Sequence, residues 1–340
     1  MKLSINKKLL IILFLALGGF KSQAQRLEAS LDYFGFADNR EYAASNRFSQ
    51  TIFGNRFSPE VGLGLDSVNH FRVGFNALYE FGSKGITKVE PVVYYRNVKN
   101  NWSFYIGAFP RQNLLDDYPR PLFKDTLNYY RPNVEGMLWK FENKHGKETM
   151  WIDWTSRQTN LDRETFLFGL SGVANFGKFY FSHHGYMFHN AGPAIAIPCD
   201  NLQDNGGIIL KLGINLSKKT FLDSLNISAG SFTSLERTRG VTNLETPTGL
   251  LVDAYAAYKK FSITNSFYTG KKHNSIYGDQ FYTANTYNRL DLGWQFINYL
   301  NVQGKFVATL HFSDGVIDNQ QAFTLRYHIA GSKKINKFLR

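Results

Sequence analysis

The segment FSHHGYMFHN, residues 181–190, brings serine and histidine close together, two residue types that hydrolase and metal sites use. Ser182 and His184 are two positions apart, so on a β-strand they share a face and could act as nucleophile and base. A serine nucleophile also needs an orienting third group, and the sequence specifies none. His183 and His189 share the opposite face but are six residues apart, about 20 Å along a strand, too far to hold one ion. We therefore expect no catalytic residue and no metal site here.

A second candidate is the polar stretch RQNLLDDYPRPLFKDTLNYYR, residues 111–131, in which Pro119 and Pro121 restrict the backbone. If this stretch narrowed a water-filled pore, its mixed charges would orient polar solutes and its tyrosine rings could stack on sugars. The alternative is an ordinary surface loop that is charged because it is wet. The candidates for a pore constriction are Arg111, Asp116, Asp117, Tyr118, Arg120, Lys124, Asp125, Tyr129, Tyr130 and Arg131.

Long β-strands must position these side chains, because apolar residues alternate with polar or small residues along most of the chain. In residues 289–296, Leu290, Leu292, Trp294 and Phe296 fall on one face, and the polar or small residues between them fall on the other. The same period predicts about sixteen strands: 26–36, 59–66, 70–81, 87–97, 102–110, 132–142, 148–156, 164–175, 178–190, 206–217, 224–235, 248–258, 261–270, 286–297, 299–312 and 320–330.

Tight and long connections alternate between these predicted strands. The gaps after every even-numbered strand are short, whereas 37–58, 111–131, 191–205, 236–247 and 271–285 are long. A membrane barrel with short periplasmic turns and long external loops has this pattern, and a β-sandwich has no reason for it. Sixteen strands also make a barrel too wide for wall side chains to fill, so the apolar face belongs outside, against lipid. A soluble sandwich or propeller is the alternative, because alternation alone fits it equally well.

The polar faces of these strands would then line a wet lumen. The candidates for this lining are Arg72, Lys88, Arg96, Asp153, Arg157, Lys211, Asp253, Arg289, Asp291, Lys305, Arg326 and His328. Basic residues outnumber acidic ones in this set, which favours anions or neutral polar solutes over cations. The alternative is that pairs such as Arg289 and Asp291 neutralise each other across the wall.

The ends of the chain indicate export. Residues 1–24 have a basic start, an apolar run over 9–20 that is too short to span a bilayer, and small residues at Ser22 and Ala24. We expect a cleaved signal peptide over 1–24, a single barrel over 25–330 and a basic tail over 331–340. Cys199 is the only cysteine, so no internal disulfide forms. The net charge of +12 is spread along the strands, so we expect no nucleic-acid partner and no cofactor.

In this architecture the chain resembles the outer-membrane porins of Gram-negative bacteria. The stretches RFSQTIFGNRFSPEVGLGL (47–65) and YIGAFPR (105–111) are also similar to uncharacterised barrels of Bacteroidota. In porins the third external loop folds into the lumen, which here is 111–131, and sixteen-stranded porins form trimers, so a homo-oligomer is implied. Many such barrels end on an aromatic residue that the outer-membrane assembly machinery recognises. Here Phe338 or Tyr327 would have to serve.

The resemblance predicts a non-enzymatic outer-membrane pore for small polar or anionic solutes, with saccharides among the candidates, whose partners are the lipid bilayer and those solutes. Two alternatives stay open. One is a barrel enzyme that hydrolyses lipid or glycan, although Ser182 and His184 stand in the reverse order to the His-then-Ser pair of outer-membrane phospholipases. The other is a plugged structural or adhesion barrel.

Overall fold

A computed structural model describes residues 26–195, 201–217 and 219–334, and within them sixteen antiparallel strands form one closed barrel. The predicted signal peptide and residues 335–340 of the predicted tail lie outside the described residues. The strands are β1 (Arg26–Glu41), β2 (Gln50–Gly64), β3 (Asn69–Glu80), β4 (Lys88–Lys99), β5 (Trp102–Pro110), β6 (Asn133–Asn143), β7 (Gly146–Ser156), β8 (Thr165–Phe176), β9 (Phe179–Asn190), β10 (Gln203–Asn215), β11 (Ser224–Thr238), β12 (Thr248–Tyr258), β13 (Phe261–Gly270), β14 (Thr286–Tyr299), β15 (Val302–Ser313) and β16 (Val316–Lys334).

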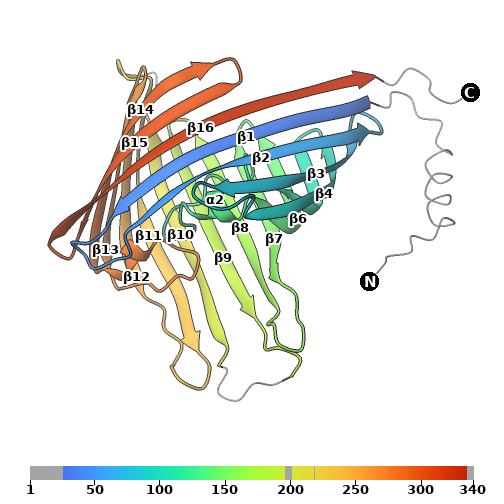
Figure 1. Ribbon diagram of the computed structural model, residues 1–340. Helices are drawn as coiled ribbons and strands as arrows, with labels where there is room; N and C mark the ends of the chain where they lie inside the picture. The colour runs from blue at the N-terminus through green and yellow to red at the C-terminus, as the bar shows by residue number, and fades with distance from the viewer. Residues whose placement is uncertain (1–25, 196–200, 218, 335–340) are drawn as a thin grey trace, which may run out of the picture.

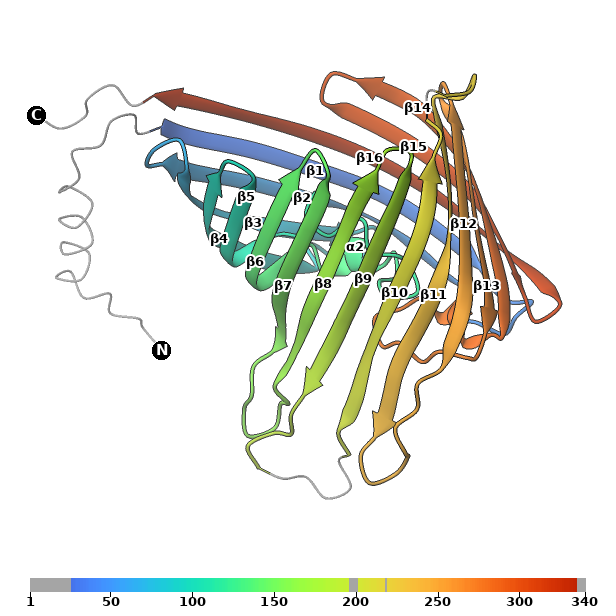
Figure 2. The same ribbon diagram turned by 180° about the vertical axis from the view of Figure 1, so that it is seen from behind.

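Each strand pairs with its neighbours in the sequence, and β1 pairs with β16 to close the ring. This closing register runs from Arg26 opposite Lys334 to Glu41 opposite Asn319, so the first and last strands lie side by side over their lengths (Figure 1). Figure 2 shows the opposite wall, built from β6 to β13. The predicted all-β barrel of about sixteen strands is confirmed.

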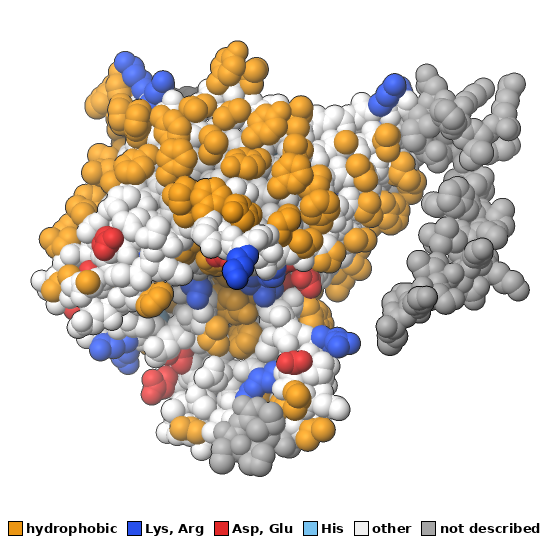
Figure 3. Space-filling view, in the orientation of Figure 1, with side chains coloured by type: hydrophobic (Ala, Val, Ile, Leu, Met, Phe, Trp, Pro, Cys, Tyr) orange, Lys and Arg blue, Asp and Glu red, His pale blue; other side chains and the backbone are white. Residues whose placement is uncertain are grey.

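The outer surface of the barrel carries the bulky apolar side chains. Along β14, Leu292 and Trp294 are exposed, whereas Arg289 and Asp291 on the other face are buried. Hydrophobic side chains gather over the upper part of the face in Figure 3, and charged side chains are more frequent toward its lower edge. This arrangement suits a barrel whose outer face meets lipid, because only a bilayer favours such a surface on a closed sheet.

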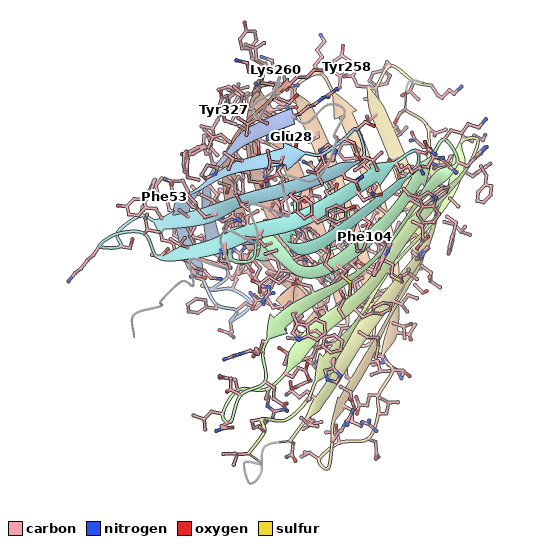
Figure 4. The ribbon with its side chains drawn as sticks, turned by 90° about the vertical axis from the view of Figure 1, so that its right-hand side faces the viewer. Glu28, Phe53, Phe104, Tyr258, Lys260 and Tyr327 are labelled. Carbon is pink, nitrogen blue, oxygen red and sulfur yellow. The ribbon has the colours of Figure 1, made fainter. Side chains whose placement is uncertain are left out.

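The two ends of the barrel differ in the length of their connections. The short turns include 65–68, 100–101, 144–145, 177–178, 259–260 and 300–301, and we call this the short-turn end. Tyr258 and Lys260 mark one of these turns in Figure 4. The other end, the loop end, carries 111–132, 191–202, 239–247 and 271–285. In outer-membrane barrels short turns face the periplasm and long loops face outward.

Two strands extend well beyond their predicted ranges. β2 begins at Gln50 instead of residue 59, and β16 runs from Val316 to Lys334, four residues past the predicted end of the barrel. In β2 the outward face includes Asn55 and Pro59, and the inward face includes the buried Ile52, so the expected alternation is broken. Asp314 and Gly315, both with positive φ, form a two-residue hairpin turn between β15 and β16. The predicted strands 299–312 and 320–330 left a longer loop between them.

Among the described residues, helical structure is confined to two short pieces in the loops, α2 (Leu127–Tyr130) and the 3₁₀ turn η1 (Gln280–Thr283). Among the described residues, no helix has the length and apolar character needed to cross a membrane. Figures 1 and 2 both show α2 inside the ring of strands, which places its loop in the lumen.

Candidate functional site

The third loop, residues 111–132, folds into the barrel and is held there by wall side chains. Arg56 of β2 donates hydrogen bonds to the carbonyl oxygens of Asn128 (2.9 Å) and Tyr129. On the opposite wall, Tyr118 donates to the carbonyl oxygen of Gly185 (3.0 Å) and accepts from the indole of Trp151 (2.8 Å). The loop is therefore fixed to β2, β7 and β9, on both sides of the lumen.

A second loop, residues 271–285, also folds inward, and sequence reasoning missed it. The backbone N–H of Lys124 donates to the carbonyl oxygen of Tyr277 (2.8 Å), and the N–H of Asp279 donates to that of Arg120 (2.9 Å). These two backbone bonds join the loops into one body. We call residues 111–132 and 271–285 together the plug.

The plug and the barrel wall share a hydrophobic core inside the lumen. Leu122, Phe123 and Leu127 of the third loop and Phe281 and Tyr282 of the second loop are buried in it. The wall contributes inward apolar side chains from eleven neighbouring strands, β4 to β14, among them Phe109, Leu138, Trp151, Leu167, Ile209, Phe232, Leu251, Tyr268 and Tyr287. We expected a wet lumen, because wall side chains alone cannot fill a barrel of this size. At the height of this core the lumen is filled instead, because the two loops supply the volume that the wall side chains lack.

A buried charge cluster lies where the plug meets β14. Arg120 contacts Asp125 (3.0 Å) and Asp291 (3.5 Å), and Arg289 contacts Asp291 (2.8 Å), Asp125 (3.6 Å) and Asp279 (3.8 Å). Burial alone would raise the pKa of the Asp125 carboxyl, but Arg120 and Arg289 hold it well below its usual range. Burial keeps the pKa of Asp279 above its usual value. The cluster pairs its charges internally and ties the plug to the wall.

Asp153 of β7 fixes the two ends of the third loop. Its carboxylate accepts from Arg111 (2.5 Å), lies 3.5 Å from Arg131 and accepts from the backbone N–H of Glu135 (3.0 Å). Asp153 is fully buried, so these partners replace the water that a carboxylate otherwise needs.

The other predicted constriction residues are spread over the plug. Asp117 contacts Lys147 (2.5 Å), and these charges hold the pKa of Asp117 at about 2, against the effect of burial. Tyr129 is buried against Phe36, and Tyr130 donates to Glu80 (3.0 Å). Asp116 accepts from the backbone of Asn113, and Lys124 is exposed.

Eleven of the twelve predicted lumen residues lie on inward faces. Lys211 and Asp253 pair with each other across β10 to β12, and Lys88 reaches the carbonyl oxygen of Tyr130 (3.3 Å). Arg72, Arg96, Arg326 and His328 line one cavity, and Lys305 lines another near the short-turn end. The prediction was wrong for Arg157, which lies in an exposed loop, because β7 shifts register between Trp154 and Ser156 and its pairing with β8 ends at Ser156.

The histidines of β9 divide between the two faces of the wall. Ser182 and His184 are buried on the inward face, away from lipid. His189 on the outer face stacks on Phe166, with ring centroids 4.3 Å apart. His183, also outward, contacts the carboxylate of Glu148 (3.0 Å) across Gly172, whose lack of a side chain leaves room for the pair. Within the described chain, no group of three or more metal-ligating side chains gathers at one point.

A different Ser–His pair forms where the second loop meets β11. The hydroxyl of Ser234 lies 2.6 Å from Nδ1 of His273 and 2.5 Å from a carboxylate oxygen of Glu236. The Tyr268 hydroxyl lies 2.8 Å from Nε2 of His273 and also contacts the carbonyl oxygen of Lys271. Burial lowers the pKa of His273 to about 4, so the imidazole is neutral at pH 7. Ser234 and His273 are 39 residues apart, so no local spacing in the sequence signals the pair.

An apolar groove of about 340 Å³ runs over the outer wall, on the opposite face of β11 from the side chain of Ser234, which is buried on the inward face with Phe232. Phe168, Leu170, Met187 and Ile208 line it, each more than a third exposed. Ser234 and Thr246 also line the groove. Phe168 and Met187 are each three residues from the loop end of their strand, so the groove lies in the loop half of the barrel.

A family model described as "Lipid A 3'-O-deacylase-type" matches residues 20–331 of the chain. None of the curated proteins compared with the chain matches it significantly. Similar solved structures include a loop-deletion mutant of the outer-membrane protein OmpT of Vibrio cholerae (TM-score 0.57, 9% identity, 90% of this chain and 100% of that chain). OccK3 (OpdO) of Pseudomonas aeruginosa has a TM-score of 0.52 and 12% identity over 89% and 96% of the two chains. A triple mutant of the Rhodopseudomonas blastica porin has a TM-score of 0.51 and 10% identity over 89% and 100%.

These matches confirm the predicted likeness to outer-membrane porin barrels at the level of the fold. They contradict the prediction that the chain is not an enzyme, because the family that matches nearly all of it is an enzyme family. That prediction followed from the resemblance to porins and from the lack of an orienting third group for Ser182 and His184, and it had no access to residues that the fold brings together from distant parts of the chain.

Proposed function

Since the chain belongs to the lipid A 3′-O-deacylase-type family, we propose that it is an outer-membrane hydrolase that removes an ester-linked acyl chain from a lipid A-type glycolipid. The family match over residues 20–331 carries this proposal, because it spans all sixteen strands and both loops of the plug. The fold is compatible with it, since a barrel whose outer face meets lipid can take its substrate from the bilayer.

The apolar groove supports this proposal, because it could hold one acyl chain beside the wall. Its exposed lining is hydrocarbon or aromatic, and it lies in the loop half of the barrel. In an outer membrane that half faces the external leaflet, where lipid A resides. Arg237 and Arg239 lie at the loop end of β11, two and four residues after the groove residue Leu235. Phosphate groups of the bound glycolipid would lie near these two cations.

We further propose Ser234 as the nucleophile and His273 as its base. Because Tyr268 can donate its proton to the carbonyl oxygen of Lys271, Nε2–H of His273 donates to Tyr268 and Nδ1 is an acceptor facing Ser234. The single hydroxyl proton of Ser234 is donated to Glu236, so it must turn to Nδ1 before the reaction. Nδ1 takes the hydroxyl proton as Oγ attacks the ester carbonyl, and the departing sugar hydroxyl takes that proton when the ester C–O bond breaks. Water then hydrolyses the acyl-serine and releases the fatty acid. Both side chains are buried, so the groove must deepen toward Ser234 for the ester to arrive.

Mass spectrometry of lipid A tests the function directly. Expression in a Gram-negative host with fully acylated lipid A should produce species lighter by one hydroxyacyl or acyloxyacyl chain. Heat-shifted gel mobility shows whether the barrel is folded in the outer membrane. Unchanged lipid A in cells that contain the folded barrel would overturn the proposed function.

Variants of the Ser–His pair test the site separately from the function. Ser234→Ala and His273→Asn should each abolish the lighter lipid A species. Ser182→Ala is the matched control, because Ser182 is equally buried on the inward face but lies in β9 and has no contact with His273. Deacylation that survives Ser234→Ala would show that the family activity is present with a different nucleophile.

Passive diffusion of small polar or anionic solutes is a second candidate function, which the likeness to porin barrels and the basic inward residues favour. The plug opposes it, because its apolar core joins the wall on many strands. Single-channel recording of the refolded protein in a planar bilayer separates the two. Steady conductance steps that prefer anions would support a pore, whereas silent bilayers together with lipid A deacylation would leave the hydrolase alone.

A further inference from the structure

A cavity of about 410 Å³ lies in the lumen between the plug and the short-turn end of the barrel. The plug residues Arg111, Asn128 and Arg131 line one side of it, and Ser30 and His328, close to the short-turn ends of β1 and β16, line the other. A volume of this size accommodates a small molecule. In an outer-membrane barrel it would be reached from the periplasm, on the opposite side of the plug from the external loops.

Cationic side chains dominate the walls of this cavity. Six arginines line it: Arg56, Arg72, Arg96, Arg111, Arg131 and Arg326. It has three carboxylates, each with a partner of its own: Asp32 contacts His328 (2.7 Å), Glu60 accepts from the Tyr94 hydroxyl (3.0 Å), and Asp116 accepts from a backbone N–H. The cavity therefore carries an excess of positive charge.

Arg72 forms salt bridges with Glu28 (2.9 Å) and Glu60 (3.8 Å), and Arg111 and Arg131 form theirs with Asp153. The other three arginines make no salt bridge within the described chain. Arg56 donates only to two neutral carbonyl groups of the third loop. Arg326 stacks on the ring of Phe34, with its guanidinium carbon 3.9 Å from the ring centroid, and makes no salt bridge there. Arg96 makes no salt bridge among the described residues either. Burying cations without counter-charges is unfavourable unless another anion joins them.

The guanidinium nitrogens point to the same conclusion independently of the charge count. Five of the six arginines have a buried side-chain nitrogen without a hydrogen-bond partner: Nε of Arg56, Arg72, Arg96 and Arg131, and Nη1 of Arg111. Arg56 and Arg111 are each only 4% exposed, so bulk water does not supply the missing acceptor. These nitrogens are covered by protein, so an oxyanion would reach them only if the guanidinium groups turned toward the cavity, but they leave the arginines with hydrogen-bonding capacity that an oxyanion could use.

We propose that this cavity is a binding site for a small, soluble, multiply charged oxyanion of the phosphate class, taken from the periplasmic side. Phosphate oxygens match the forked geometry of guanidinium groups and accept several hydrogen bonds each. Arg56 links this site to the plug, because it lines the cavity and also holds the backbone of residues 128 and 129. An anion that contacts Arg56 would thereby reinforce the attachment of the third loop to β2. This inference does not depend on the proposed hydrolase activity.

Isothermal titration calorimetry with inorganic pyrophosphate tests the site on the full barrel, refolded in a zwitterionic detergent. We expect saturable binding with one site per barrel that weakens as salt rises. Arg96→Gln and Arg326→Gln should each lower the affinity about tenfold, the usual consequence of losing one charge-assisted contact. Arg326→Lys should fall between the wild type and Arg326→Gln, because it keeps the charge but loses the fork.

Arg157→Gln is the matched control, because it removes the same charge from an exposed position past the end of β7. Absence of pyrophosphate binding to the wild-type barrel would overturn the proposal, as would equal weakening by Arg157→Gln. A short-chain phosphatidic acid, titrated in the same detergent, distinguishes a lipid headgroup from a free anion. Binding of that lipid without binding of pyrophosphate would also overturn the proposal that the ligand is a soluble anion. Gel mobility before and after heating checks that every variant is folded.

Discussion

The backbone N–H of Lys124 donates a hydrogen bond to the carbonyl oxygen of Tyr277, 2.8 Å away, although 153 residues separate them. This contact joins the third loop to the loop between β13 and β14 in the middle of the lumen. Each loop by itself would carry unpaired backbone groups into an apolar interior, which is unfavourable. Together they satisfy each other, so the two loops are expected to enter or leave the lumen as one unit.

Leu122→Ala should loosen this unit. Leu122 is fully buried in the core that the plug shares with the wall, and truncating such a side chain costs about 2–5 kcal/mol. We expect transient conductance steps in planar bilayers to become more frequent than for the wild type. Leu161→Ala is the control, since Leu161 is 76% exposed in an external loop. Identical recordings from the two variants would show that the plug core does not control passage.

Asp153→Asn should weaken the anchor at the base of the third loop. It leaves the buried Arg111 without its anionic partner, and breaking a buried ion pair costs about 3 kcal/mol or more. Trypsin should then cleave after Arg111 or Lys124 faster than in the wild-type barrel. Asp162→Asn, in an exposed loop where Asp162 contacts only Thr159, should leave the cleavage rate unchanged. Equal resistance of both variants would contradict the anchoring role of Asp153.

The stability of the plug should fall as the pH drops from about 6.5 to about 4. Burial lowers the pKa of His273 to about 4, so below pH 6.5 the unfolded chain binds a proton that the folded chain still excludes. The loss should reach on the order of 3 kcal/mol near pH 4 and be absent above pH 7. The temperature at which gel mobility shifts, measured against pH, reports it. In His273→Gln this part of the pH dependence should disappear, and an unchanged profile would exclude His273 as its source.

Gly185→Leu should block the outer groove. Gly185 lines the groove, and a Cβ there would meet the Gly207 carbonyl oxygen at 3.2 Å, so the rest of a leucine side chain must project into the open space. We expect lipid A deacylation to fall at least about tenfold while the barrel folds normally. Ala229→Leu is the matched control, because Ala229 is exposed on the outer face of β11 away from the groove. Undiminished deacylation by Gly185→Leu would exclude the groove as the acyl-chain site.

Alternation along the chain was enough to predict the strands of this barrel. The ranges 102–110, 248–258 and 261–270 agree with β5, β12 and β13 at both ends. Period-two patterning is a local property, and in a closed barrel every strand meets the same two environments, so each strand can be recognised alone. The missed start of β2 has a local reason as well. Ile52 faces inward there and packs on Tyr129 of the plug, which reverses the rule that inward residues are polar.

The functional sites could not be predicted in the same way. Ser182 and His184 are two positions apart in the sequence and were the natural pair to weigh, but the sequence specifies no third group to orient them. Ser234 and His273 meet only because the second loop turns into the lumen and brings His273 against β11. The length of residues 271–285 indicated a loop but not its direction, since no charge pattern like that of 111–131 accompanies it.

The sequence by itself determined the class of fold, the number of strands and which face of each strand meets lipid, because all three follow from side chains two residues apart. Only the tertiary structure decided that the lumen is plugged, that Arg56, Arg96 and Arg326 share one cavity without forming salt bridges, and that Ser234 meets His273. These features depend on contacts between residues tens to hundreds of positions apart. Closure of the barrel fixes such distances, and no local pattern encodes them.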